Sequence, residues 1–371
     1  MSEMEARARE TAQWQVLAFH ARSFRWASAF LNEEQRRKVA ALYAFCRTVD
    51  DLADQPGSRP EAHRDLERLE AALEAEPGAE ALWPESYLWF RALCVESGID
   101  FRVVRDLLRG MSSDLREVRL QNDRELLRYC YRAAGTVGLM MCAVLGVRDR
   151  RSCRYAVDLG IAMQLTNISR DVLEDARACR VYLPADRLAL YGVDPEDLVH
   201  AKADPEAVSL VVSEVLDIAE DYYRSADAGM RFLPPRARWA VLVASRLYRG
   251  IGRRLRRRYQ SNPLLGRVVV PWFEKLGLVA SATLSWLRLS IWPPRLRNLD
   301  VTDDDPSALP YADTDTAAVA VADADTDSDG VPVPVPDAAT ATDTVPDSDV
   351  GSKRDAVSVV SVRETTLEQT H

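Results

Sequence analysis

Apolar residues recur every three or four positions through most of residues 1–292, the spacing typical of amphipathic or buried helices. The segments with this pattern are 13–31, 35–54, 101–118, 124–146, 150–176, 205–230 and 235–259. The alternating pattern typical of strands is missing, and stretches rich in Pro and Gly, such as "QPGSRP" and "EAEPGAE", fall between the helical segments. The pattern predicts an all-α domain of about ten helices.

The helical pattern stops near residue 298. Residues 298–371 consist largely of Asp, Thr, Ala, Val and Pro. A chain that is so polar and like-charged buries too little surface to offset the entropy cost of ordering it. We therefore expect one domain over 1–297 and a disordered acidic tail over 298–371. Within the tail, "DADTDSDG" is similar to a calcium-binding loop, but it lacks the closing Glu and the flanking helices, so we do not expect a calcium site.

Charge divides the chain in the same way. The net charge is −9, but residues 300–371 carry 17 acidic and 3 basic side chains, and residues 1–299 carry 45 basic and 40 acidic ones. The six cysteines form no CxxC pair, and the opening "MSEMEARARE" is unlike a signal peptide, so we expect reduced thiols and a cytoplasmic protein. The most apolar run, "LGLVASATLSW", is about half as long as a membrane span.

Oxygen-bearing side chains gather on one face of the predicted helix over 150–176. Asn167, Asp171 and Asp175 follow one another at about 40° steps around the helix, and Gln164 falls in the same arc. Glu174 lies about 20° outside the arc. Taken alone, this face is also compatible with a solvated helix surface.

A second acidic face lies in the predicted helix over 35–54. Asp50 and Asp54 are one turn apart, and Asp51 is about 60° from Asp54. Like charges at this spacing weaken a helix by a few tenths of a kcal/mol unless a counter-charge lies between them. Two such faces beside apolar sequence predict carboxylates that point into a shared cavity. The chain has only four histidines, so the expected metal is a hard cation bound by oxygen, Mg²⁺ with Mn²⁺ as an alternative.

At these residues the chain resembles the squalene/phytoene synthase family, in its bacterial phytoene synthase branch. The resemblance rests on "ALYAFCRTVDDLAD" and "QLTNISRDVLEDARACRVYLPADRL". Four shorter motifs follow the family's order: "HARSF", "LLRGMSSDL", "YCYRAAGTVG" and "RLYRGI". The resemblance covers about residues 14–292 and implies an isoprenoid-synthase fold, a single helical domain around a central cavity.

The resemblance also implies roles for individual residues. It makes Asp50, Asp54, Asn167, Asp171 and Asp175 metal ligands, the aspartates also being catalytic, with Asp51 and Glu174 in support. It places Tyr129 beside the reacting groups as a catalytic residue. The positions that match substrate-binding residues are His20, Ser23, Phe24, Tyr43, Arg47, Gln164, Asn167, Tyr182, Tyr248 and Arg267. Two departures stand out: the family usually has Gly at Cys179 and a large apolar residue at Ser169.

The implied reaction is the head-to-head condensation of two geranylgeranyl diphosphates, through a cyclopropyl diphosphate, to phytoene, the first committed step of carotenoid biosynthesis. The cation formed on the way needs a dry cavity, and the small residues Ala134, Gly135 and Gly138 would let a prenyl chain approach a helix backbone. Each of these residues alone is equally compatible with close helix packing. We expect no redox cofactor, because a Gly-rich dinucleotide fingerprint is missing.

Two alternatives stay open. The first is dehydrosqualene or squalene synthesis from two farnesyl diphosphates, of which squalene would require NADPH. Head-to-tail elongation and terpene cyclisation also use aspartate-rich helices, but they lack the "RVYLP" signature. The second is a non-catalytic binding or assembly relative, which should have lost aspartates that this chain retains.

A separate question concerns the role of "RLYRGIGRRLRRRY", which carries seven arginines. The charge alone would suit a nucleic-acid-binding helix, but aromatic readers and a binding motif are absent, so we expect no nucleic acid. A solvated face, or peripheral contact with anionic lipid at the inner face of the cell membrane, fits better, because the Trp-bearing segment 268–292 follows. The sequence leaves the oligomeric state open.

Overall fold

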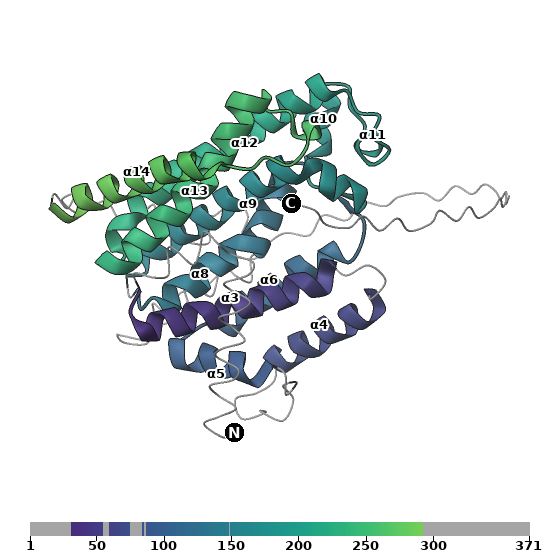
Figure 1. Cartoon of the computed structure of the whole chain (residues 1–371). Coiled ribbons are helices and arrows are strands. Elements are labelled where there is room, and N and C mark those ends of the chain that lie inside the picture. Colours follow the sequence, from purple (N-terminus) through teal and green to yellow (C-terminus); the bar gives the residue numbers. More distant parts are fainter. Residues whose placement is uncertain (1–30, 55–58, 75–83, 85–86, 148, 292–371) are drawn as a thin grey trace, which may run out of the picture. The chain divides into compact units, whose positions relative to one another are not determined.

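The computed structural model describes residues 31–54, 59–74, 84, 87–147 and 149–291 (Figure 1). These residues form twelve α-helices: α3 (Glu33–Asp54), α4 (Arg59–Glu74), α5 (Leu88–Ser97), α6 (Phe101–Asp114), α7 (Asp123–Cys130), α8 (Thr136–Val144), α9 (Arg151–Arg177), α10 (Ala185–Leu190), α11 (Pro195–Val199), α12 (Pro205–Gly229), α13 (Pro235–Tyr259) and α14 (Trp272–Ile291). The expected all-α fold is confirmed. None of the described helices is both long and apolar enough to cross a membrane.

Two very short strands depart from the expectation of helices alone. Strand β1 (Val118–Arg119) pairs in parallel with β2 (Arg180–Val181), with Val118 opposite Arg180. Two residues are too few to leave an alternating pattern in the sequence. The pair nevertheless ties the chain after α6 to the chain after α9.

Helix α9 carries the second acidic face, and it packs against α8, α12 and α13 (Figure 1). Its contact with α8 is antiparallel and unusually close. A Cβ atom at Gly138 would overlap the carbonyl oxygen of Ala156, and one at Gly160 would overlap that of Ala134. One turn further, the Cys142 sulfur lies 4.0 Å from the Ser152 hydroxyl. The glycines therefore allow the two backbones to touch, as the packing explanation of Gly138 required.

The segment 124–146, expected as one helix, is divided. Helices α7 and α8 are separated by a π-helical turn, η3 (Tyr131–Gly135). A Cβ at Gly135 would lie 3.0 Å from the Tyr131 ring and 3.2 Å from Val157, so this turn is also closely packed. The periodicity of a single segment cannot reveal a one-residue insertion of this kind, and such turns occur frequently at functional sites.

Candidate active site

The second acidic face contains an ion pair that the sequence did not suggest. The Arg170 Nε lies 2.7 Å from Asp171 Oδ1, and a second guanidinium nitrogen binds the other carboxylate oxygen. Both side chains are largely buried, at 14% and 17% exposure. Adjacent helical residues do not normally face each other, so the spacing gave no signal for this pair.

Asp175, one turn after Asp171, has a different environment. Burial raises the pKa of its carboxyl to about 8, and the neighbouring Asp171 charge adds to the effect. Arg180, from β2, acts in the opposite direction. A nearby cation stabilises the ionised form of a carboxyl whose pKa has been raised in this way. The arrangement therefore favours an added positive charge beside Asp175.

The amide part of the same face is also incompletely paired. The Asn167 Nδ2 donates to Gln164 Oε1 at 3.4 Å. The Asn167 Oδ1 is buried and has no hydrogen-bond partner among the described residues. Buried oxygens of this kind normally have partners, so this atom is a suitable ligand for a metal or a diphosphate-bound group.

On α3, an arginine lies between the carboxylates of the first motif. Arg47 donates to Asp50 at 2.8 Å and also pairs with Asp51. It supplies a counter-charge to Asp50, one of the two like-charged residues one turn apart. Tyr43, one turn earlier, is partly buried, and burial raises its pKa. The side chain of Asp54 and the residues His20, Ser23 and Phe24 lie outside the described part of the chain.

Tyr248, on α13, connects the two faces. Burial raises the pKa of its hydroxyl, Arg170 lowers it and Asp171 raises it. The same hydroxyl raises the pKa of Tyr43 on α3. Tyr248 therefore lies near charged groups of the second motif and near Tyr43 beside the first. Arg267 also reaches the second motif, at 3.8 Å from Glu174, with both side chains exposed.

Tyr129 and Tyr182 meet at a buried carboxylate that the sequence analysis did not single out. Both hydroxyls donate to Asp114, at 2.9 Å and 2.7 Å. Burial raises the pKa of Asp114 to about 6, and the charge of Asp50 contributes. Asp114 in turn raises the pKa of Asp175. The available signal was its place in "LLRGMSSDL", one of the short motifs that carry the family resemblance.

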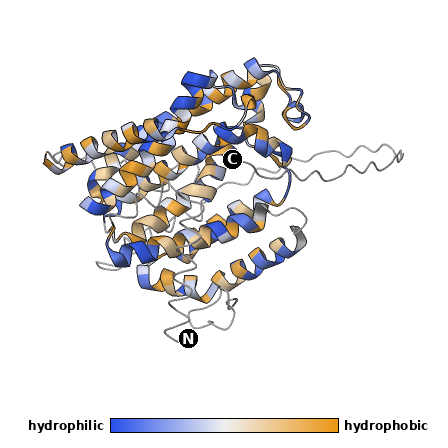
Figure 2. Cartoon of the chain, in the orientation of Figure 1, coloured by the Kyte–Doolittle hydropathy of each residue, from blue (hydrophilic) through white to orange (hydrophobic). Residues whose placement is uncertain are grey.

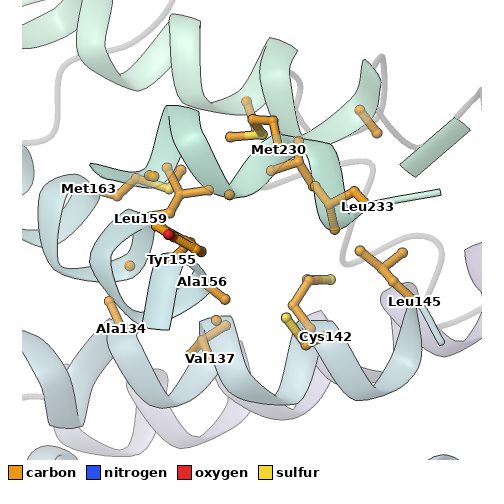
Figure 3. A pocket seen from close by; sticks show the side chains of 18 of the residues that line it. Ala134, Val137, Cys142, Leu145, Tyr155, Ala156, Leu159, Met163, Met230 and Leu233 are labelled. Atoms are coloured by element: carbon orange, nitrogen blue, oxygen red, sulfur yellow. The ribbon is translucent and has the colours of Figure 1, made fainter. Parts of the chain in front are cut away.

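An apolar cavity of about 270 Å³ begins at Gln164, Asn167 and Tyr248 and extends along α8 and α9 (Figure 3). Its wall on α9 runs from Asn167 back to Ser152, and α8 contributes the facing wall down to Cys142 and Leu145. Ala134 and Gly138 line it, whereas Gly135 is not among the lining residues. Such a wall shields a hydrocarbon chain from water.

The described residues fit a metal that is also coordinated by waters and substrate phosphates. No three His, Cys, Asp or Glu side chains of the described ranges converge on a single metal position. Mg²⁺ commonly uses one or two carboxylates together with waters and substrate phosphates, so a protein cage is not required. The unpaired Asn167 oxygen and the buried Asp175 carboxyl suit this shared coordination.

An all-α fold with acidic faces beside an apolar cavity defines the class of isoprenoid-synthase-like prenyltransferases. The chain belongs to the squalene/phytoene synthase family, whose sequence model matches residues 17–274. The phytoene synthase of Pseudescherichia vulneris is 40% identical over 247 residues, which cover 64% of this chain and 79% of that protein. The 15-cis-phytoene synthase of Pantoea ananas is 34% identical over 295 residues, covering 77% of this chain and 95% of the relative.

Solved structures agree with this assignment. A dehydrosqualene synthase in complex with a ligand superposes with a TM-score of 0.64 at 27% identity, covering 77% of this chain and 98% of that one. A squalene synthase from Alicyclobacillus acidocaldarius gives a TM-score of 0.60 at 20% identity, covering 69% of this chain and 96% of that one, and supports the fold alone.

Proposed function

We propose that this chain is a phytoene synthase, which joins two geranylgeranyl diphosphates head to head through a cyclopropyl diphosphate. The observation that carries the proposal is the cavity, which is polar at Gln164, Asn167 and Tyr248 and mainly apolar beyond them. The relatives named phytoene synthase, at 34–40% identity, support the same reaction.

The residues at the polar end suit the departure of diphosphate. Arg47 and Arg170 supply positive charge, and we assign Tyr43, Tyr248 and Arg267 to the same substrate-binding region. Mg²⁺, bound by Asp50, Asp54, Asn167, Asp171 and Asp175, would neutralise the charge that develops on the leaving group. A neutralised diphosphate is a better leaving group, so an allylic cation can form without a protein nucleophile.

The apolar end suits a long prenyl tail. From Gln164 to Ser152 the cavity follows α9 for about 18 Å at 1.5 Å per residue. We assign the tail of geranylgeranyl diphosphate to this wall. The likeness to the dehydrosqualene synthase is the observation that supports the alternative substrate, farnesyl diphosphate.

The direct test is incubation of the purified protein with Mg²⁺ and either geranylgeranyl or farnesyl diphosphate, without NADPH, followed by identification of the hydrocarbon. We expect phytoene from the C20 substrate, and loss of product when EDTA is added. Dehydrosqualene as the main product would transfer the assignment to the farnesyl reaction. A product that requires NADPH would indicate squalene synthesis, and EDTA-resistant turnover would exclude the metal role.

We also propose peripheral contact of α14 with an anionic membrane at the cytoplasmic side. Phe273, Leu276, Leu284, Leu287 and Ile291 lie three, four or eight residues apart, and all are exposed. Figure 2 shows hydrophobic residues recurring along this helix. Trp272, at its start, is 73% exposed. Such a stripe with an aromatic end is typical of a helix that lies in the lipid interface.

Charge favours anionic lipid over a second protein copy as the partner. Residues 235–291 contain 12 Lys and Arg and one acidic residue, Glu274, which is paired with Arg254. Carboxylates of α12 also pair with four of these arginines, Arg246, Arg249, Arg253 and Arg256. The segment still has an excess of basic side chains. The test is cosedimentation with phosphatidylglycerol and phosphatidylcholine vesicles, comparing the wild type with Leu276→Ser/Leu284→Ser. We expect the variant to lose binding to the anionic vesicles. Equal binding of the two proteins, or a dimer that the variant abolishes, would reject the lipid contact.

A further inference from the structure

Asp114 is the last residue of α6 and the meeting point of two tyrosines that are distant in sequence. Its Oδ2 accepts the Tyr129 hydroxyl at 2.9 Å, and its Oδ1 accepts the Tyr182 hydroxyl at 2.7 Å. All three residues are less than 9% exposed. The two rings are stacked, with centroids 4.5 Å apart. Each carboxylate oxygen thus holds one phenol.

The short strand pair explains how Tyr182 reaches this position. Asp114 lies four residues before β1, and Tyr182 directly follows β2. The pairing of Val118 with Arg180 brings these two stretches together. Arg119 reinforces the connection by donating to the Cys179 carbonyl at 2.7 Å. The two-residue strand pair therefore brings Tyr182 beside Tyr129 at Asp114.

The hydrogen bonds also fix the direction of both hydroxyl groups. An ionised carboxylate only accepts, so both phenol protons point toward Asp114. The lone pairs of the two phenol oxygens are then directed away from it. Hydrogen bonds to a charged acceptor are stronger than neutral ones and increase the negative charge on the donor oxygen. Such oxygens are suited to lie against developing positive charge, and they are unsuited to donate a proton to it.

We propose that Asp114 is a positioning residue that orients the Tyr129 and Tyr182 hydroxyls with their lone pairs toward the cationic part of the reacting prenyl groups. The proposal rests on the proposed function and on the family resemblance, which implies that the two tyrosines lie near the reacting groups. Asp114 acts through the tyrosines and needs no contact with substrate or metal. Misplacement of a reacting-site group by about 1 Å can lower a rate by about 100-fold.

The test compares Asp114→Asn with a matched variant on the same helix. Asp106 is also buried on α6 and accepts a tyrosine hydroxyl, that of Tyr131, at 3.4 Å. Asp106→Asn therefore removes a similar buried charge without touching Tyr129 or Tyr182. We expect Asp114→Asn to lower kcat by about 10- to 100-fold, with KM and the Mg²⁺ requirement within about twofold of the wild type. Asp106→Asn should retain kcat within about threefold.

Two further measurements separate positioning from a merely structural role. Tyr129→Phe should lower kcat in the wild type but change it by less than about threefold in the Asp114→Asn background, because the two residues act as one unit. Ultraviolet resonance Raman bands that report tyrosine hydrogen bonding should shift in Asp114→Asn and not in Asp106→Asn. This spectroscopic readout does not depend on catalysis.

Several results would overturn the proposal. These are wild-type kcat in Asp114→Asn, additive effects in the double variant, or recovery of kcat at high Mg²⁺, which would make Asp114 a metal ligand. If Asp114→Asn does not fold, Tyr182→Phe replaces it, and unchanged kcat and Tyr129 bands in that variant would equally reject the proposal. A wild type that converts no prenyl diphosphate, but shows the Raman shift on substitution, would reject the proposed function and leave the hydrogen-bond geometry intact.

Discussion

Arg170 and Asp171, neighbours on helix α9, form a two-point ion pair, with Nε and Oδ1 2.7 Å apart. Asp175, one turn later, lies near Arg180, which lowers its pKa, but burial and the charge of Asp171 raise that pKa to about 8. Two aspartates that look equivalent in the motif are therefore different in the folded protein. The first is already paired with a cation, whereas the second acquires its full charge when a cation arrives.

This difference predicts a pH dependence of the metal-free protein. Between about pH 4 and pH 8, folded Asp175 keeps a proton that the unfolded chain has released, so its contribution to stability falls as pH rises through this window and levels off above about 8. In EDTA, Asp175→Asn should melt several degrees higher than the wild type at pH 8 and at nearly the same temperature at pH 4. Parallel melting curves across this range would contradict the assignment.

The far end of the cavity predicts control of substrate length. Cys142 and Ser152 face each other there, so Cys142→Phe should shorten the space for the prenyl tail. We expect the ratio of kcat/KM for farnesyl over geranylgeranyl diphosphate to rise at least tenfold. Cys153→Phe, on the facing helix α9 next to Ser152 but not among the lining residues, is the control. An equal loss with both substrates would show that the tail does not reach this layer.

Cys179 predicts a gain in stability. Its φ of 57° lies in the left-handed region, at the position where the family usually has glycine. This conformation costs a side-chain-bearing residue about 1–2 kcal/mol, partly offset by the greater chain entropy that glycine loses on folding. Cys179→Gly should therefore raise stability by about 0.5–1 kcal/mol, seen as a higher Tm with unchanged activity. Cys179→Ala keeps the strain and should show no gain; equal Tm values for the two variants would reject this explanation.

The sequence predicted what periodicity encodes and missed what depends on side-chain conformation and on contacts between distant segments. The spacing of Asn167, Asp171 and Asp175 was sufficient to place them on one face of α9. It could not reveal that the Arg170 side chain pairs with the carboxylate of its neighbour Asp171. Asp114 was missed for a related reason, since its partners Tyr129 and Tyr182 are 15 and 68 residues away.

Another prediction concerns the acidic tail, which is not among the described residues. Deleting 302–371 should leave kcat and Tm nearly unchanged, because the tail contains neither aspartate motif and its composition cannot build a core. Removing its charge should strengthen binding to anionic vesicles at low salt, with a smaller difference at high salt. A Tm lowered by many degrees would show that the domain extends beyond residue 297. Equal vesicle binding at both salt concentrations would show that the tail does not shield the domain.

The central claim is that the acidic faces of α3 and α9 act together on a metal-bound diphosphate. The most direct measurement is kcat for phytoene formation in Asp50→Asn and Asp171→Asn across a Mg²⁺ titration, with Asp51→Asn and Glu174→Gln as neighbouring controls. Both motif variants should lose about 10²- to 10³-fold in kcat, since they remove charge at the reacting centre. Asp171→Asn also leaves the largely buried Arg170 without its carboxylate and should lower the Tm, so kcat is measured well below the melting temperature of each variant. The controls should lose less than about tenfold. Near-wild-type kcat in either motif variant at saturating Mg²⁺ would contradict the account.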